Sequence, residues 1–316
     1  MRNIALGLAG LMLLTAGRQT QQSAPIERRD DGTQHIRVET RLVTVAVNAV
    51  DAHGAPVGGL QKDDFEISED GKAQKIAVFE RESSTPLQMV LSIDASESVF
   101  IDERLEKEAA KKFVRGILRK QDSMDLMNFA DDVDEVVAFT NDPHKIESSL
   151  GNLKHGDATA MYDAIYLAAQ RMTEAPPAPG QRRVIVLITD GEDTTHHGSY
   201  DSALEQVQRA GAMVYALIMV PVAADAGRNT GGEHALIQMA NDTGGKYYYV
   251  EDRRDLAPAF EHLSDDLRTQ YSLAYYAPQK GVDDRTGLRH IHVQLKDGAA
   301  AKGATLRYRT AYYGNR

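Results

Sequence analysis

The strongest constraint on the fold is a run of apolar segments that alternates with amphipathic segments between residues 87 and 270. Residues 87–94 and 182–190 are apolar almost throughout, whereas residues 102–120 and 159–175 repeat apolar side chains at helical spacing. Strands that are apolar on both faces occur where helices cover both sides of a parallel sheet. We therefore expect an α/β fold, with a doubly wound and mostly parallel sheet, over residues 85–270.

The two flanks of this region carry strand signals without helices. Residues 36–50 alternate branched apolar residues with others, and the turn Glu69-Asp70-Gly71-Lys72 predicts a hairpin. Beyond Gln270 the sequence again has only strand-like segments. We expect a small β-sandwich that is built from residues 36–84 and 271–316, with the α/β domain inserted in it or flanked by it.

Residues 1–17 have the layout of a secretory signal peptide. Arg2 precedes an apolar run from Ile4 to Leu14, and small residues follow. The run is too short to span a bilayer, although an uncleaved membrane anchor is the alternative. Residues 18–35 are polar and are expected to form a flexible tether. These features predict a secreted or periplasmic protein without a stable membrane span after cleavage.

Composition excludes several classes of function. The formal net charge of -10 argues against nucleic acid as a partner, because the phosphate backbone attracts basic surfaces. The absence of cysteine excludes disulfides, thiolate zinc sites and thiol nucleophiles.

Oxygen-bearing side chains gather at three predicted strand ends. Asp94, Ser96 and Ser98 follow the first apolar strand, Thr159 opens a helix, and Asp190 ends the strand 182–190. Loops at the carboxyl ends of such strands meet at one edge of the sheet. Two carboxylates and three hydroxyls suit a divalent cation, with Mg²⁺ expected and Mn²⁺ or Ca²⁺ possible. The alternative is that these residues only cap helices and turns.

The order Asp-x-Ser-x-Ser, then Thr, then Asp resembles the metal-ion-dependent adhesion site of the von Willebrand factor A domain family. The resemblance implies that the serines coordinate the ion directly, that Thr159 does so when ligand is bound, and that the two aspartates often act through water. The flanking strands resemble a bacterial subgroup of related proteins common in Acidobacteria, so the likeness covers residues 36–313. One departure is Asp157, where glycine is commoner, which adds charge near the site.

The leading functional hypothesis is a binding module that is not an enzyme. Few protein charges would surround the cation, which would therefore accept an Asp or Glu side chain from a partner protein, in adhesion or envelope assembly. The alternative is a metal-dependent phosphoryl-transfer or hydrolytic enzyme with Asp94 as nucleophile, although such enzymes usually carry a carboxylate where Ser96 stands. In a third possibility, a carboxylate of this chain or of its symmetry mate fills the site.

Four residues after Asp190 leave two interpretations open. Glu192 and Asp193 either shape the rim of the site electrostatically or lie in a solvated loop. His196 and His197 could line its mouth, but histidines of an exposed loop are the simpler interpretation.

Overall fold

The computed structural model describes residues 41–81, 85–96, 103–174, 181–220, 230–278, 287–296 and 303–314. The predicted signal peptide, the predicted tether and Ser98 lie outside these described residues. No helix among the described residues has the length and apolar character needed to cross a membrane.

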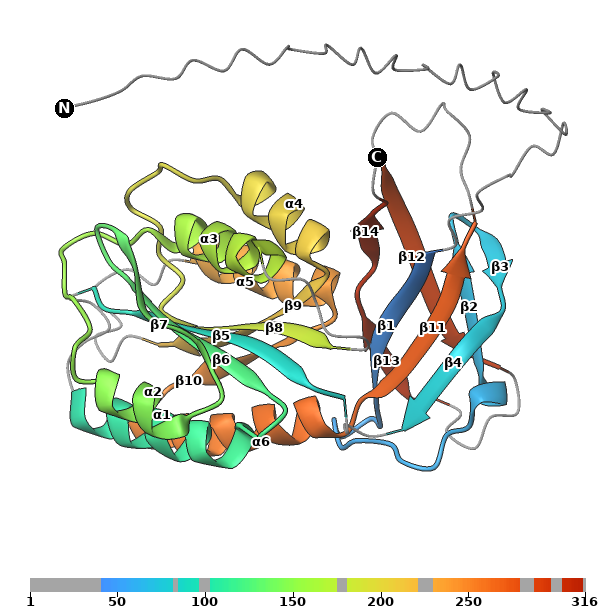
Figure 1. Cartoon of the computed structure of the whole chain (residues 1–316), viewed down its shortest axis with the longest axis horizontal. Coiled ribbons are helices and arrows are strands. Elements are labelled where there is room, and N and C mark those ends of the chain that lie inside the picture. Colours follow the sequence, from blue (N-terminus) through green and yellow to red (C-terminus); the bar gives the residue numbers. More distant parts are fainter. Residues whose placement is uncertain are drawn as a thin grey trace, which may run out of the picture. The chain divides into compact units, whose positions relative to one another are not determined.

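A six-stranded sheet forms the centre of the α/β part (Figure 1). Its order is β10 (Lys246–Val250), β9 (Ala212–Met219), β8 (Arg182–Thr189), β5 (Leu87–Asp94), β6 (Ser123–Phe129) and β7 (Val133–Thr140). All neighbours pair in parallel except β6 and β7, which are antiparallel. Strands β5 and β9 are buried along their whole length, which explains why their sequences lack polar alternation.

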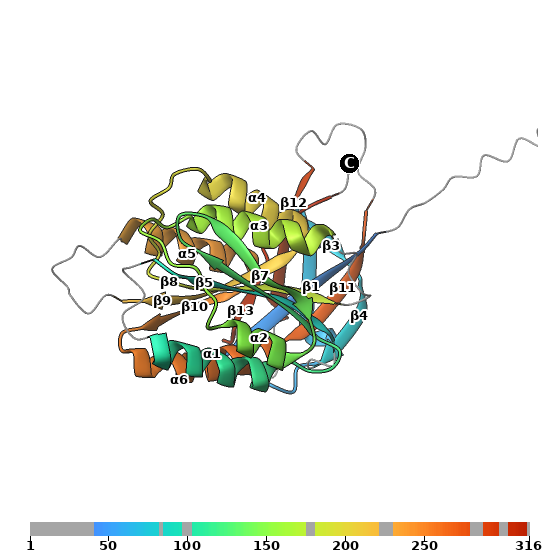
Figure 2. The same cartoon turned by 60° about the vertical axis from the view of Figure 1, so that its left-hand side comes forward.

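Helices cover both faces of this sheet (Figures 1 and 2). One face carries α1 (Glu103–Ile117), α2 (Pro143–Ser149) and α6 (Leu256–Arg268), and the other carries α3 (Met161–Glu174), α4 (Tyr200–Ala210) and α5 (Thr230–Thr243). Phe113 of α1 and Phe260 of α6 stack with ring centroids 4.4 Å apart. The expected α/β fold with a mostly parallel sheet is confirmed.

Strand β5 lies between β6 and β8, so the chain first builds one half of the sheet and then the other. This reversal creates a switch point at the carboxyl ends of β5 and β8, where ligands bind in open α/β sheets. The register pairs Ile93 with Ile188, which brings Asp94 and Asp190 to the ends of adjacent strands.

Two four-stranded antiparallel sheets flank the central sheet. One has the order β13 (Thr305–Tyr308), β1 (Arg41–Val50), β11 (Tyr271–Ala277) and β4 (Ile76–Arg81). The other has the order β14 (Ala311–Tyr313), β12 (Leu288–Leu295), β2 (Phe65–Glu69) and β3 (Lys72–Gln74). Their inner faces share one apolar core, as in a β-sandwich drawn from both flanks of the sequence. The exact domain boundaries stay a prediction.

Two expected strands are each divided between the two sheets. The second strand of the predicted hairpin breaks at Lys75: β3 pairs with β2, whereas β4 pairs with β11 of the other sheet. Residues 304–314, which have the sequence of a single strand, break likewise into β13 and β14. A short 3₁₀ helix, Lys62–Asp64, stands where no helix was expected, and another, Arg253–Asp255, precedes α6.

The second break has a physical cause in the contacts of residues 309 and 310. The Thr310 amide donates to the Asp242 carbonyl at the end of α5, 2.9 Å away, and so leaves the strand ladder. The Arg309 guanidinium donates to the Thr44 carbonyl of β1, 2.5 Å away. Gly244 leaves room for this segment, because a Cβ there would lie 2.5 Å from the Arg309 nitrogen.

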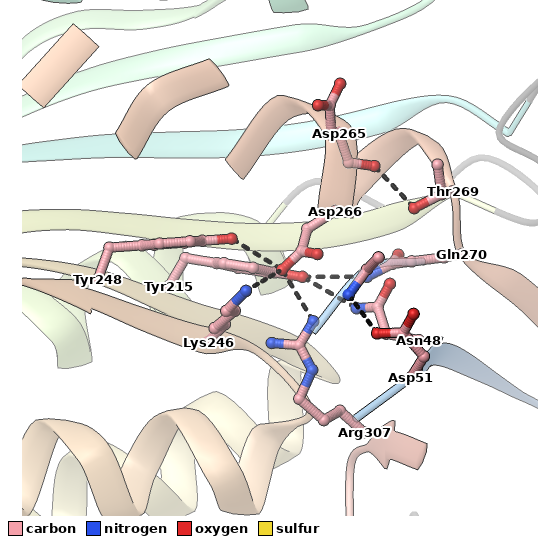
Figure 3. Close-up of polar contacts among 11 residues, drawn as sticks. Asn48, Asp51, Tyr215, Lys246, Tyr248, Asp265, Asp266, Thr269, Gln270 and Arg307 are labelled. Carbon is pink, nitrogen blue, oxygen red and sulfur yellow. Dashed lines mark hydrogen bonds and ion pairs between the residues drawn. The ribbon is translucent and has the colours of Figure 1, made fainter. Parts of the chain in front are cut away.

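A buried polar network joins α6 to sandwich residues (Figure 3). The Asp266 carboxylate accepts hydrogen bonds from the Tyr248 hydroxyl and the Arg307 guanidinium, both at 2.8 Å, and Lys246 lies 3.8 Å away. The buried Tyr215 hydroxyl accepts from Asn48 of β1 at 3.3 Å. The network satisfies charges that would be costly to bury unpaired.

Candidate metal-binding site

Asp94, the last residue of β5, is 0% exposed, and both of its carboxylate oxygens accept hydrogen bonds. The Ser96 hydroxyl and amide donate to Oδ1 over 2.7 and 3.0 Å, because the chain turns back immediately after the strand. The Thr189 hydroxyl at the end of β8 donates to Oδ2 over 2.6 Å. The carboxylate is therefore fixed in orientation by both neighbouring strand ends.

The electrostatics of Asp94 suit a cation. The pKa of Asp94 is raised to about 6, and burial is the main cause of this rise. Hydrogen bonds from Thr189 and Ser96 oppose the rise, whereas the nearby Asp190 carboxylate adds to it. Among the described residues, no Lys or Arg forms an ion pair with Asp94. Two desolvated carboxylates that repel each other would both be stabilised by a divalent cation, so the donor set fits such an ion.

The loop that carries Thr159 is attached to the end of β5 and to the turn between β6 and β7. The Gly156 amide points to the Ala95 carbonyl at 3.4 Å, and the Ala158 amide donates to Asp131 Oδ1 at 2.7 Å. Thr159 is 3% exposed and precedes α3 by two positions. Its backbone is thus held beside the segment that contains Ser96.

The loop after β8 clasps Thr159 from the opposite side. The Thr159 amide donates to the Thr194 hydroxyl at 2.8 Å, and the Thr194 amide donates to the Thr159 carbonyl at 2.9 Å. Asp193 Oδ1 accepts from the Tyr162 amide at 3.1 Å, so a carboxylate from a distant loop satisfies the first turn of α3. The Asp193 side chain is 7% exposed and is not solvated, whereas that of His196 is 82% exposed.

Helix α5 approaches the same loop through glycine. A Cβ on Gly232 would lie 1.6 Å from the Gly191 carbonyl oxygen, and Gly191 itself has a φ of +85°. Both positions therefore exclude other residues: Gly232 because of space and Gly191 because of its left-handed backbone. The backbone that follows Asp190 rests directly on the first turn of α5.

Four of the five predicted ligands lie among the described residues. Asp94, Ser96, Thr159 and Asp190 are each at most 8% exposed, and hydrogen bonds between their three loops hold these loops together. Asp157 is exposed. No group of three or more His, Cys, Asp or Glu side chains able to hold a metal ion occurs in the described ranges. The candidate set contains two such residues, and its other donors are hydroxyls.

Several supporting residues escaped the sequence analysis. Thr189 had one usable signal, since it is the lone hydroxyl in an otherwise apolar strand end next to Asp190. Asp193 was considered only as a residue of the rim, and its bond to the start of α3 was not foreseen. Thr194 and Gly232 had no signal, because their roles depend on which loops meet in space.

Comparison with known proteins adds an independent finding. The model of the von Willebrand factor type A domain matches residues 88–262, more than half of the 316 residues. The chain belongs to the von Willebrand factor type A domain family. Domains of this family generally act in protein interactions rather than as enzymes, so the chain carries an interaction module of this type. The narrower resemblance to an acidobacterial subgroup stays a prediction.

Several solved structures are similar to this chain, and the first of the three named here has the same fold. Proximal thread matrix protein 1 from the mussel byssus is 15% identical, with a TM-score of 0.51 over 64% of this chain and 51% of its own. BatB from Bacteroides thetaiotaomicron is 22% identical, with a TM-score of 0.46 over 57% and 97%. A von Willebrand factor type A protein from Catenulispora acidiphila is 14% identical, with a TM-score of 0.47 over 80% and 75%. No curated protein matches the chain.

Proposed function

We propose that this von Willebrand factor type A protein is a secreted or periplasmic binding module that captures an acidic side chain of a partner protein through a divalent cation. Asp94, Ser96, Ser98, Thr159 and Asp190 would hold the ion, with Mg²⁺ favoured. When bound, the ion supplies an electrophilic centre that accepts a carboxylate oxygen.

The observation that carries this proposal is the state of Asp94. Its carboxylate is fully buried, lies beside the Asp190 carboxylate, and has both oxygens oriented by hydroxyl donors. Burying charge of one sign is unfavourable unless an opposite charge compensates it. Hydrogen bonds from Thr189 and Ser96 orient the Asp94 carboxylate. The contacts of Thr194 fix the backbone of Thr159 in the same way, so several hydrogen bonds position the proposed ligands.

The enzymatic alternative receives less support from the same geometry. An aspartyl nucleophile must present a free oxygen to its substrate. Asp94 is 0% exposed, and each of its oxygens already accepts a hydrogen bond. Ser96 donates to this carboxylate and cannot act as the second carboxylate of a phosphoryl-transfer site.

Calorimetric titration with MgCl₂ and MnCl₂ tests the cation site directly. Wild type is expected to bind one ion, whereas Ser96→Ala and Asp190→Asn are expected to weaken binding at least about tenfold, as ligand removal does. Ser148→Ala, an exposed serine of α2, is the matched control and is expected to bind like wild type. Equal binding by Ser96→Ala and wild type would contradict the site.

Partner capture is tested separately, with the full chain as bait in envelope extracts. We expect partners that are retained in Mg²⁺, released by chelator and lost with Ser96→Ala. Identical partners in all three conditions would contradict the proposed function even if the ion binds.

A further inference from the structure

One carboxylate in the loop after β8 is shielded from water although it is not among the five proposed ligands. The Asp193 side chain is 7% exposed and follows Asp190 by three positions. Within the described ranges no Lys or Arg forms an ion pair with it, and its charged neighbour is the exposed His196, whose Nδ1 lies 3.8 Å from Oδ2. Burying this charge so close to Asp190 is unfavourable unless other groups compensate it.

The compensation comes from backbone amides, above all from the start of α3. Asp193 Oδ1 accepts from the Tyr162 amide at 3.1 Å, and Oδ2 accepts from the His196 amide at 3.3 Å. Tyr162 is the second residue of α3, where amides have no partner within the helix and the helix dipole is positive. A carboxylate binds such an amide more strongly than a neutral acceptor does. Asp193 therefore ties its loop to a segment 31 residues away in the sequence.

This bond lies next to the contacts that hold Thr159. The Thr159 amide donates to the Thr194 hydroxyl at 2.8 Å, and the Thr159 carbonyl accepts from the Thr194 amide at 2.9 Å. The Thr159 hydroxyl, by contrast, bonds to none of the described residues. The residue after Asp193 thus fixes the backbone of Thr159, while the side-chain oxygen of Thr159 stays available to a ligand.

A further close approach joins the same two segments. A Cβ on Gly198 would lie 3.0 Å from the Asp163 amide nitrogen. Residues 193–198 therefore pack along residues 159–163 rather than touching them at one point. Without the Asp193 carboxylate, the amide that it binds would lose its partner and one end of this contact would be free.

We propose that Asp193 is a positioning residue for the cation site: by binding the start of α3, it holds the Thr159 hydroxyl where it can share an ion with the other proposed ligands. This inference rests on the proposed function, because the position of the hydroxyl matters only if the ion binds. Asp193 acts through Thr159 and is not itself a ligand, since both of its oxygens already accept backbone hydrogen bonds.

Mn²⁺ titration with a double-mutant cycle tests this role. Asp193→Ala is expected to weaken Mn²⁺ binding at least about tenfold, as loss of an orienting partner does. Asp193→Asn keeps an oxygen for the Tyr162 amide and is expected to stay within about threefold of wild type. Thr159→Val removes the hydroxyl itself, so adding Asp193→Ala to it should change the affinity by less than about threefold. A further tenfold loss in the double variant overturns a role through Thr159.

Amide hydrogen exchange gives a readout that needs no ion. In the metal-free chain, the Tyr162 amide is expected to exchange slowly in wild type and in Asp193→Asn, and at least about tenfold faster in Asp193→Ala. Exchange at the wild-type rate in Asp193→Ala would show that the carboxylate does not hold the start of α3, and would overturn the proposal.

The matched control is Asp142→Ala. Asp142 caps α2 by accepting the His144 amide at 3.0 Å, so this variant loses a bond of the same kind at another helix of the α/β part. It is expected to lower the urea midpoint as Asp193→Ala does, but to bind Mn²⁺ like wild type. Equal Mn²⁺ affinities of the two variants overturn the proposal. Absence of Mn²⁺ binding in wild type overturns the proposed function, and this inference with it.

Discussion

The carbonyl oxygen of Gly191 lies against the α-carbon of Gly232, so that a Cβ at position 232 would approach this oxygen to 1.6 Å. Gly191 follows Asp190 directly, and Gly232 belongs to the first turn of α5. A neighbouring contact is also close: a Cβ on Gly191 would lie 3.1 Å from the Glu233 amide nitrogen. The position of Asp190 therefore depends on how closely α5 can approach.

Gly232→Ala is expected to push the loop of Asp190 away from α5, because no flexible side chain is available to yield. Overpacking of this kind costs about 1–3 kcal/mol of unfolding free energy. We expect Mn²⁺ affinity to fall at least about tenfold in calorimetric titration. Gly116→Ala is the control: its Cβ would meet nothing within 4 Å, and alanine inside α1 should stabilise by about 0.5–1 kcal/mol. Wild-type Mn²⁺ affinity in Gly232→Ala would show that the contact does not position Asp190.

Thr189→Val is expected to weaken the cation site without touching a proposed ligand. The change keeps the side-chain shape but removes the donor to Asp94 and the acceptor for the Gly191 amide, which lie 2.6 and 3.1 Å away. Loss of an orienting partner typically lowers metal affinity by about 10–100-fold. Thr189→Ser keeps the hydroxyl and is expected to remain within about threefold of wild type. If valine and serine behave alike in Mn²⁺ titrations, the hydroxyl has no orienting role.

Asp125 of β6 makes the stability of the protein depend on pH. Burial, and the Glu135 carboxyl next to it, raise the pKa of Asp125 from 3.8 to about 8, while Arg171 of α3 opposes the rise. Between these values the folded state holds a proton that the unfolded state has released. The free energy of unfolding should therefore fall as pH rises from about 4 to about 8, on the order of 2–5 kcal/mol in total.

Asp125→Asn is expected to remove most of this slope and to raise stability at pH 8, as measured by urea denaturation across the pH range. The exposed Asp265→Asn serves as control and should keep the slope of wild type. A slope unchanged in Asp125→Asn would contradict the assignment.

Asp266→Asn is expected to loosen the junction between α6 and the sandwich. The Asp266 side chain is 5% exposed, and its charge faces Arg307 and Lys246. Removing it leaves these cations without their carboxylate, at a cost of about 3 kcal/mol. Urea denaturation measures this loss, with the neighbouring and exposed Asp265→Asn expected to stay within about 0.5 kcal/mol of wild type. Similar midpoints for both variants would mean that the network adds little.

The arrangement of the α/β part, with helices on both faces of a mostly parallel sheet, could be predicted from the sequence. The apolar strands 87–94 and 182–190 and the helical spacing of 159–175 depend only on local periodicity, which survives in the finished fold. The oxygen-bearing strand ends at Asp94 and Asp190 follow from the same reasoning, since parallel strands bring their carboxyl ends to one edge.

The residues that support the site were beyond local patterns. Asp193 accepts a hydrogen bond from the Tyr162 amide in the first turn of α3, and Gly232 packs against Gly191. Both contacts join segments that are distant in the sequence, and no local periodicity encodes them. The break at Lys75 was missed for a related reason. A strand of period two can leave one sheet for another without any change in its alternation, so only the partner strands reveal the crossing.

Arg81 and Tyr271 are paired neighbours in the β4–β11 ladder, although the whole α/β part lies between them in the sequence. Antiparallel partners of this kind are about 5 Å apart, so the chain enters and leaves the α/β part at almost the same point. Tension applied between residues 41 and 314 is carried across this ladder by the sandwich. When the protein is stretched between these two residues, the loops around Asp94 therefore bear no load until β4 separates from β11.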